Sequence, residues 1–242
     1  MTNFQGTGYP GGLKPAGKEY IYLKRFMPSR RFHFLAAASG ILGTIALTVY
    51  FSAPFWLMPL PPPNATTAQI ISFGTKYRTV ILWDTWLQQA GSILSVLFVL
   101  ALVHLAGSSQ RFAGKLVLLV SGVILALSLA EGTFILAALQ SADNGHYEAS
   151  VTCVDIASVF VHIFLLAPSL FLVLGFALWK TSFLPHLFSV LALSLGLLFQ
   201  VLGVAGLFSS TALLIVIFVL LGQNLWTLAA SVSLLFRKQK MS

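Results

Sequence analysis

Six long apolar stretches constrain the fold of this chain more than any other feature of its sequence. A helix needs about 20 predominantly apolar residues to cross the hydrocarbon core of a bilayer. The stretches that meet this requirement cover residues 32–50, 79–105, 116–139, 151–179, 184–208 and 212–236. We therefore predict an all-α, polytopic membrane helical bundle with six transmembrane helices.

The composition excludes a water-soluble fold. Of the 242 residues, 57% are hydrophobic and 8% are charged, whereas a soluble domain carries about 25% charged residues. A soluble fold of this length could not bury so much apolar surface. The net charge is +8, but most of the basic residues flank the apolar stretches. We therefore expect the lipid bilayer, and not nucleic acid, to be the partner.

The distribution of Lys and Arg predicts the orientation of the bundle. With the N-terminus inside, the cytoplasmic side carries every Lys and Arg of the chain except Lys76 and Arg78. Because basic residues favour the cytoplasmic side, we predict a multi-pass protein of the inner (plasma) membrane with both termini in the cytoplasm. The expected parts are a basic N-terminal segment (1–31), a membrane domain (32–236) and a basic tail (237–242).

The segments between the stretches contain residues that interrupt helices. Residues 58–64 read MPLPPPN, which predicts an extended external loop after a first helix that Pro54 stops. Ser209 and Ser210 form the shortest connection, so we expect the last two helices to be antiparallel neighbours. Small-residue stripes indicate close helix packing; they comprise Gly40, Thr44 and Thr48 in the first helix, and Gly196, Gln200 and Gly203 in the fifth.

Polar side chains inside the apolar stretches are the candidate functional residues, because the bilayer makes such groups costly. Asp84, Glu131 and Asp155 all fall in the outer half of the bilayer once the alternating helix directions are considered. Asp155 and His162 also share one helix face. Lipid offers these groups no hydrogen bond, so we expect them to turn inward and meet. The full candidate set is Asp84, Gln88, Glu131, Asp155, His162, Gln200, Gln223 and Asn224.

Three functions are compatible with this pattern. The favoured one is a non-enzymatic subunit or scaffold of a larger membrane complex, because motifs such as HExxH, GxxxxGK[ST] and CxxC are absent. The first alternative is a small transporter or receptor with an outward-facing polar pocket formed by Asp84, Glu131, Asp155 and His162. The second is a membrane enzyme that uses the same carboxylates with His162. The amides and hydroxyls could instead fix the bundle through interhelical hydrogen bonds.

The sequence does not identify a cofactor. The single cysteine, Cys153, is too little for a metal site. A haem between His104 and His162 is disfavoured because the two residues fall at different depths in their helices. Ligation of haem or chlorophyll through a single histidine is a less favoured alternative.

The C-terminal third carries two short motifs. The fourth stretch ends in LGFALWK and continues into TSFLP (residues 174–185), and the last helix contains Asn224-Leu225-Trp226 before an Arg-Lys end. With these motifs the chain resembles a bacterial family of six-helix membrane proteins known as domain of unknown function 4386. The resemblance implies six spans and an inner-membrane setting, and it implies no particular reaction.

Overall fold

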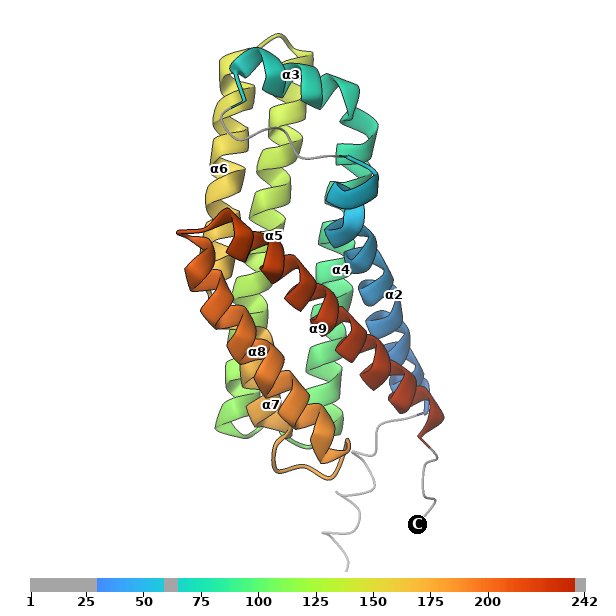
Figure 1. The fold of residues 1–242 in the computed structure, drawn as a ribbon. Coiled ribbons are helices and arrows are strands. Elements are labelled where there is room, and N and C mark those ends of the chain that lie inside the picture. The colour runs from blue at the N-terminus through green and yellow to red at the C-terminus, as the bar shows by residue number, and fades with distance from the viewer. Residues whose placement is uncertain (1–29, 59–64, 238–242) are drawn as a thin grey trace, which may run out of the picture.

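The computed structural model describes residues 30–58 and 65–237, and this part of the chain is helical without any strand (Figure 1). Its helices are α2 (Arg30–Trp56), α3 (Thr67–Lys76), α4 (Arg78–Leu105), α5 (Phe112–Asp143), α6 (Tyr147–Leu166), α7 (Leu170–Leu178), α8 (His186–Gly206) and α9 (Ser210–Phe236). Six segments are long and apolar enough to cross a membrane, and α6 with α7 forms one of them. The predicted all-α bundle of six spans is confirmed, and its orientation stays a prediction.

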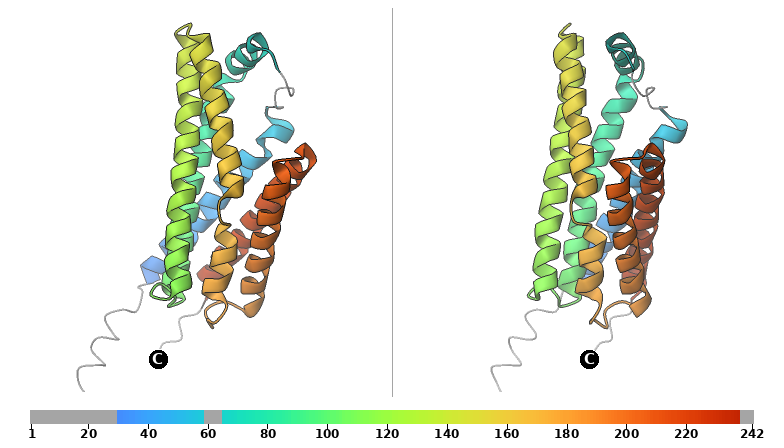
Figure 2. Two further views of the ribbon diagram at one scale, coloured as in Figure 1. Left: turned by 90° about the vertical axis from the view of Figure 1, so that its left-hand side faces the viewer. Right: turned by 60° about the vertical axis from the view of Figure 1, so that its left-hand side comes forward.

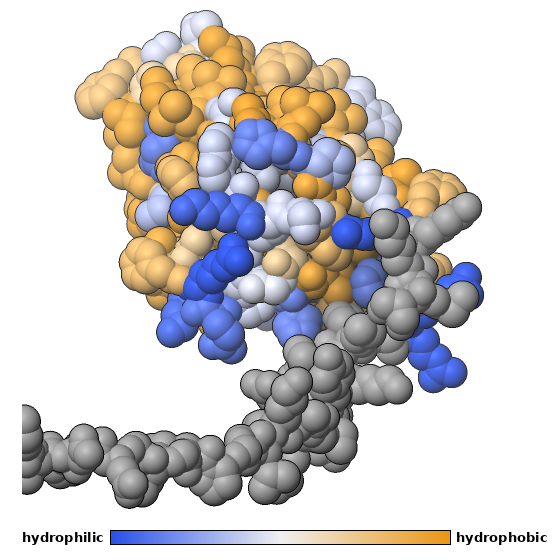
Figure 3. Space-filling view, turned by 90° about the horizontal axis from the view of Figure 1, so that it is seen from below, coloured by the Kyte–Doolittle hydropathy of each residue, from blue (hydrophilic) through white to orange (hydrophobic). Residues whose placement is uncertain are grey.

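The two ends of the bundle differ in character. One end, here called the basic end, contains Arg30, Arg111, Lys115, Lys180 and Arg237. Seen from this end, hydrophilic residues gather over the surface while the flanks are hydrophobic (Figure 3). The opposite end, here called the α3 end, carries α3 and the turn between α5 and α6 (Figure 1). The predicted basic segment before residue 30, most of the proline-rich loop and the tail after residue 237 lie outside the described residues.

Large apolar side chains fill the half of the bundle next to the basic end. Phe98, Leu102, Leu174, Leu178 and Leu234 are fully buried there. The Trp226 ring packs edge-on against Phe171 and Phe188, and its indole N–H donates to the Phe188 carbonyl at 2.9 Å. These contacts join α4, α7, α8 and α9 into one apolar core.

The α3 end extends beyond the thickness of a bilayer. Helix α5 has 32 residues and is therefore about 48 Å long, whereas the hydrocarbon core is about 30 Å thick. Trp83 and Trp86 are 62% and 57% exposed, as expected of aromatic anchors at a membrane interface. From Trp86 to Leu105 the helix rises about 28 Å. This length matches a hydrocarbon core that ends near the two tryptophans, beyond which the tip of α5 would project.

Two local features differ from the sequence-based expectation. Pro54 does not stop the first helix, which continues to Trp56. Proline is tolerated in membrane helices where neighbouring groups satisfy the freed backbone. The segment Thr67–Lys76 forms α3, which lies across the α3 end against α4 and α6 (Figure 1). It is too short and polar to resemble a span, and a capping box between Thr66 and Gln69 starts it.

The helices pack in two groups that share α2 and α7. Helix α5 lies between α4 and α6, whereas α9 packs on α2 and α8. The views in Figure 2 show the α8–α9 hairpin beside the longer helices α5 and α6. The hairpin confirms the predicted antiparallel pair. The small-residue stripe of α2 makes one of the contacts, because a Cβ atom on Gly40 would overlap Ser231 of α9 and Phe98 of α4.

Candidate functional site

A cavity of about 440 Å³ lies in the half of the bundle toward the α3 end. Small-molecule sites in proteins typically measure about 300–1,000 Å³. Residues from α2, α4, α5, α6, α8 and α9 line the cavity, together with the break between α6 and α7. The predicted candidates among the lining residues are Asp84, Gln88, Glu131, Gln223 and Asn224.

The lining is apolar over most of its surface. Aliphatic and aromatic side chains from every wall contribute to it, among them Leu47, Phe51, Val96, Ile124, Phe164, Phe199, Val216 and Leu220. Polar side chains are concentrated where α4 faces α5 and on one stretch of α9. The cavity therefore has an apolar body with two localised polar walls.

The first polar wall is a ladder of side chains between α4 and α5. The Gln88 Nε2 donates to Glu131 Oε2 at 2.7 Å, and the hydroxyls of Ser92 and Ser128 lie 3.0 Å apart. Asp84, Gln88 and Ser92 are spaced four residues apart and so occupy one face of α4. No hydrogen bond or ion pair joins the Asp84 carboxylate to a residue within 30–58 or 65–237.

The electrostatic character of this wall is acidic. Asp84 of α4 and Glu131 of α5 both line the cavity, and Tyr50 of α2 lines it as well. Among the described lining residues there is no Lys, Arg or His to balance the two carboxylates. The ion pair of this end, Arg78 with Asp143 at 2.6 Å, lies near the tips of α4 and α5 and does not line the cavity.

The second polar wall connects α9 to its neighbours. The Asn224 Nδ2 donates to the Thr48 hydroxyl of α2 at 3.4 Å. The Gln223 Nε2 reaches the Leu195 carbonyl of α8 at 3.5 Å. The interhelical hydrogen bonds that the sequence suggested for amides are therefore present at these two residues. Both amides hold α9 in place while they also face the cavity.

The predicted fourth helix is broken, and the break forms part of the cavity wall. Pro168 has no N–H, and the Ser169 N–H donates to Gln200 Oε1 of α8 at 3.0 Å in place of a helical carbonyl. Ala167, Pro168 and Ser169 line the cavity, whereas Gln200 does not. The α8 backbone approaches closely, because a Cβ on Gly196 would overlap Leu172 and one on Gly203 would overlap the Leu165 carbonyl. Gln200 thus accepts the hydrogen bond of a backbone N–H that the break leaves without a helical partner. The glycines of the predicted stripe, Gly196 and Gly203, let α8 come close enough for this contact.

Asp155 and His162 lie outside the cavity, which corrects the expectation that all the candidates meet. Both side chains are exposed on the flank of α6, and the His162 Nδ1 lies 2.7 Å from the Ser158 carbonyl. Their spacing places them on one face, as predicted, but the buried face of α6 is a different one, formed by Ser150, Ala157 and Leu165. Whether any candidate is functional stays a prediction.

The structure adds cavity residues that sequence reasoning did not select. Ser92, Ser128 and Tyr50 are lining residues. The two serines could have been found, because Ser92 follows Gln88 by one helical turn and Ser128 precedes Glu131 by one. Tyr50 carries no such signal, because its place depends on how α2 packs against α4.

The histidines and acids do not form a metal site in the described part of the chain, where no three His, Cys, Asp or Glu side chains come together. His104 packs edge-on against Phe32 at the basic end, with ring centroids 5.7 Å apart. His162 lies on the α6 flank toward the other end. The two histidines are therefore in separate parts of the bundle.

The fold and the site together define a class of protein: a six-span membrane bundle with a mainly apolar cavity between its helices, lined by two carboxylates. Comparison of the chain with protein-family models, with curated proteins and with solved structures finds no match. The resemblance of the C-terminal third to the six-helix bacterial family stays a prediction.

Proposed function

We propose that this multi-pass membrane protein binds a small, mainly apolar molecule in the cavity between its helices, as a transporter or a receptor does. The observation that carries the proposal is the cavity of about 440 Å³ with its apolar lining and its acidic wall at Asp84 and Glu131. Ligand sites in proteins combine a mostly apolar lining with a few polar groups that orient the ligand. They also occur preferentially between the helices of bundles.

The polar wall supports binding over a purely structural role. Two carboxylates within a membrane bundle are costly, and each interhelical hydrogen bond contributes only about 0.6 kcal/mol. The α4–α5 pair is already joined by Ser92 and Ser128. Asp84 joins no two helices, because its carboxylate has no partner among the described residues. A ligand that contacts Asp84 would give this acid a role that helix packing does not.

The position of His162 weighs against the enzyme alternative. That alternative requires His162 beside the carboxylates as an acid–base partner. His162 instead lies on the exposed flank of α6, and the partner of Glu131 is the amide of Gln88. An amide orients a carboxylate but exchanges no proton at neutral pH. The carboxylates therefore suit ligand recognition better than proton transfer.

The proposed setting is the inner (plasma) membrane with the basic end in the cytoplasm. The support is the charge bias, because Arg30, Arg111, Lys115, Lys180 and Arg237 share one end of the bundle. Reporter fusions after residue 237 and within the α5–α6 turn test this orientation. A cytoplasmic reporter should be active only in the first fusion, and the reverse pattern would contradict the assignment.

A matched pair of tryptophan substitutions on α9 tests the binding function. Leu220 lines the cavity, whereas Leu225 is 68% exposed on the same helix. Both variants, in lipid nanodiscs, are compared with the original protein in a thermal-unfolding screen of small apolar compounds. A ligand at ten times its Kd stabilises by about 1.4 kcal/mol. We expect hits that shift the original protein and Leu225→Trp but not Leu220→Trp, since the latter fills the cavity.

Two results would count against the proposal. One is a set of hits that stabilise Leu220→Trp as much as the original protein. The other is a broad screen with no compound whose effect depends on Leu220. Size-exclusion profiles of both variants confirm that each forms the same particle before the comparison is made.

The exposed stripe on α6 favours a second candidate function, that of a subunit of a membrane complex. Asp155, Ser158 and His162 are all exposed on one flank of this helix. Hydrocarbon offers polar groups no hydrogen bond, whereas a helix of another protein can. Gentle solubilisation followed by measurement of the particle mass tests this function. A monomeric particle without a second protein would contradict it, and Asp155→Leu with His162→Leu should release a partner that binds there.

A further inference from the structure

We propose that the ligand of the cavity is an organic cation, an amine with an apolar body, whose ammonium group binds at Asp84 and Glu131. The inference rests on the proposed binding function and specifies the chemical class of its ligand. It follows from three properties of the cavity, namely its charge, its hydrogen-bonding groups and the shape of its apolar part.

The charge of the lining favours a cation. Asp84 and Glu131 both line the cavity, and no described lining residue carries a positive charge. An unbalanced negative charge is poorly solvated inside a bundle, so a charge of opposite sign is attracted strongly there. An anionic ligand would be repelled by the negative charge of the two carboxylates. An ammonium group balances it.

The hydrogen-bonding groups point in the same direction. The amides of Gln88, Gln223 and Asn224 already donate to protein oxygens, at Glu131, Leu195 and Thr48 respectively. The carboxylate of Asp84 accepts no hydrogen bond from the described residues, and Glu131 accepts one, at a single oxygen. Unused acceptors therefore dominate the acidic wall. A ligand that donates hydrogen bonds fits this wall better than one that accepts them.

The apolar part of the cavity supplies a place for the body of the amine. Leu165, Phe199 and Val216 form a buried cluster between α6, α8 and α9, and all three line the cavity. The acidic wall belongs to other helices, α4 and α5. A molecule with its ammonium group at Asp84 would direct its hydrocarbon part toward this cluster. Burial of that part stabilises the complex by about 25 cal/mol per Å².

The test uses two probes that differ in charge but not in shape, 4-phenylbutylamine and 4-phenylbutan-1-ol. Equilibrium binding of the radiolabelled amine is measured with the full chain in nanodiscs of zwitterionic lipid, and the alcohol is added as a competitor. Hydrogen bonds to charged groups change affinity by about tenfold or more. We expect the amine to bind at least about tenfold more tightly than the alcohol.

Variants of the two acids test which carboxylate binds the ammonium group. Asp84→Asn should weaken amine binding by about tenfold and leave alcohol binding within about twofold, because only the ionic contact is lost. Asp84→Glu should retain most of the amine affinity. The matched control is Asp155→Asn, since Asp155 is an acid toward the same end of the bundle but outside the cavity. Glu131→Gln is a second test should Asp84→Asn fail to give a normal particle.

The outcomes separate this inference from the proposed function. Equal affinity for amine and alcohol, with both lost in Leu220→Trp, would overturn the cation assignment and leave the binding cavity in place. Equal effects of Asp84→Asn and Asp155→Asn would also overturn the assignment. Amine binding that is unaffected by Leu220→Trp would contradict both proposals. Loss of amine binding in Asp84→Asn and Leu220→Trp, but not in Asp155→Asn, would support both.

Discussion

The same helices build a filled half and a hollow half of the bundle. Next to the basic end, Phe98 and Leu102 of α4 meet Leu174 of α7 and Leu234 of α9 in a core without solvent exposure. Toward the α3 end, α4 and α9 instead face each other across a cavity of about 440 Å³. Helix α9 crosses the bundle obliquely (Figure 1), so its two ends have different neighbours.

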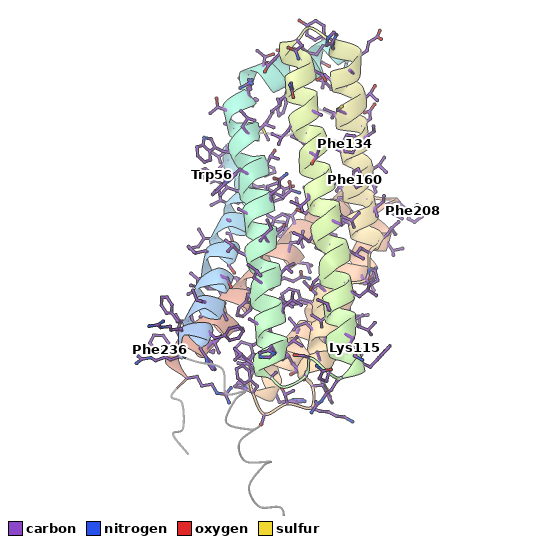
Figure 4. The ribbon with its side chains drawn as sticks, turned by 180° about the vertical axis from the view of Figure 1, so that it is seen from behind. Trp56, Lys115, Phe134, Phe160, Phe208 and Phe236 are labelled. Atoms are coloured by element: carbon purple, nitrogen blue, oxygen red, sulfur yellow. The ribbon has the colours of Figure 1, made fainter. Side chains whose placement is uncertain are left out.

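The difference between the halves comes from residue size and from the break in the fourth span. Small residues let α9 approach α2 closely near the basic end, where Gly40 meets Ser231. Farther from the basic end, the fourth span breaks between α6 and α7 at Pro168, and α9 begins near the exposed turn that contains Phe208. Figure 4 shows Phe208 projecting from the side of the bundle, while Lys115 and Phe236 mark the basic end. The helices therefore pack closely near the basic end, whereas the break in the fourth span borders a cavity with room for a ligand.

The largest expected effect tests whether the filled half carries most of the stability. Leu174→Ala removes a side chain with 0% exposure from the core and should lower the free energy of unfolding by about 2–4 kcal/mol. Leu220→Ala is the matched control at the cavity wall. It should lower that free energy by less than about 1 kcal/mol, because a side chain beside an existing void loses fewer contacts. Unfolding of detergent-solubilised protein measures both, and equal losses would erase the distinction between the halves.

The second prediction concerns the close approach of α8 to the broken span. Gly196→Ala places a methyl group against the Leu172 backbone and should lower the free energy of unfolding by about 1–3 kcal/mol. Gly122→Ala is the control on α5, where a Cβ meets open space. There the change should raise helix stability by up to about 1 kcal/mol. Thermal unfolding should therefore move in opposite directions, and a neutral Gly196→Ala would refute the tight contact.

The third prediction concerns the acidic wall of the hollow half. Gln88→Leu removes the amide that donates to Glu131 and should lower the free energy of unfolding by about 1 kcal/mol. Gln140→Leu, at an exposed position on α5, is the control. Its effect should stay within about 0.5 kcal/mol, because a substituted surface side chain rarely changes stability by more. Similar values for the two variants would mean that the Gln88–Glu131 contact does not stabilise the bundle.

The smallest expected effect compares two acids, one that lowers the stability of the ligand-free protein because it serves ligand binding, and one exposed acid that does not affect stability. Asp84→Asn should raise the free energy of unfolding of the ligand-free protein by about 0.5 kcal/mol, because it removes one of the two carboxylates that line the same cavity. Asp155→Asn should leave it unchanged, since this exposed carboxylate has no partner in residues 30–58 and 65–237. Thermal unfolding in nanodiscs measures the difference. Destabilisation by Asp84→Asn would show that this acid serves the fold itself.

Much of the polar wall was predictable from α4 and α5 alone. Asp84, Gln88 and Ser92 are spaced four residues apart, so they lie on one face of α4 whatever surrounds that helix. Their burial follows from the cost of polar groups in hydrocarbon. The same reasoning was wrong for Asp155 and His162, although their spacing was read correctly. Helical spacing shows which side chains share a face, but it does not show which face of α6 packs against its neighbours, and that face is formed by Ser150, Ala157 and Leu165.

The sequence by itself determined the number of spans and the helical class, because apolar length and bilayer thickness leave a chain of this composition no other fold. It also predicted which side chains share a helix face, since helical periodicity is a local property. Only the tertiary structure decided which face of α6 turns inward, how Gln200 satisfies the break at Pro168, and that a cavity separates α9 from the acidic wall. These features depend on the relative positions of helices distant in the chain, and those positions result from the packing of all of them together.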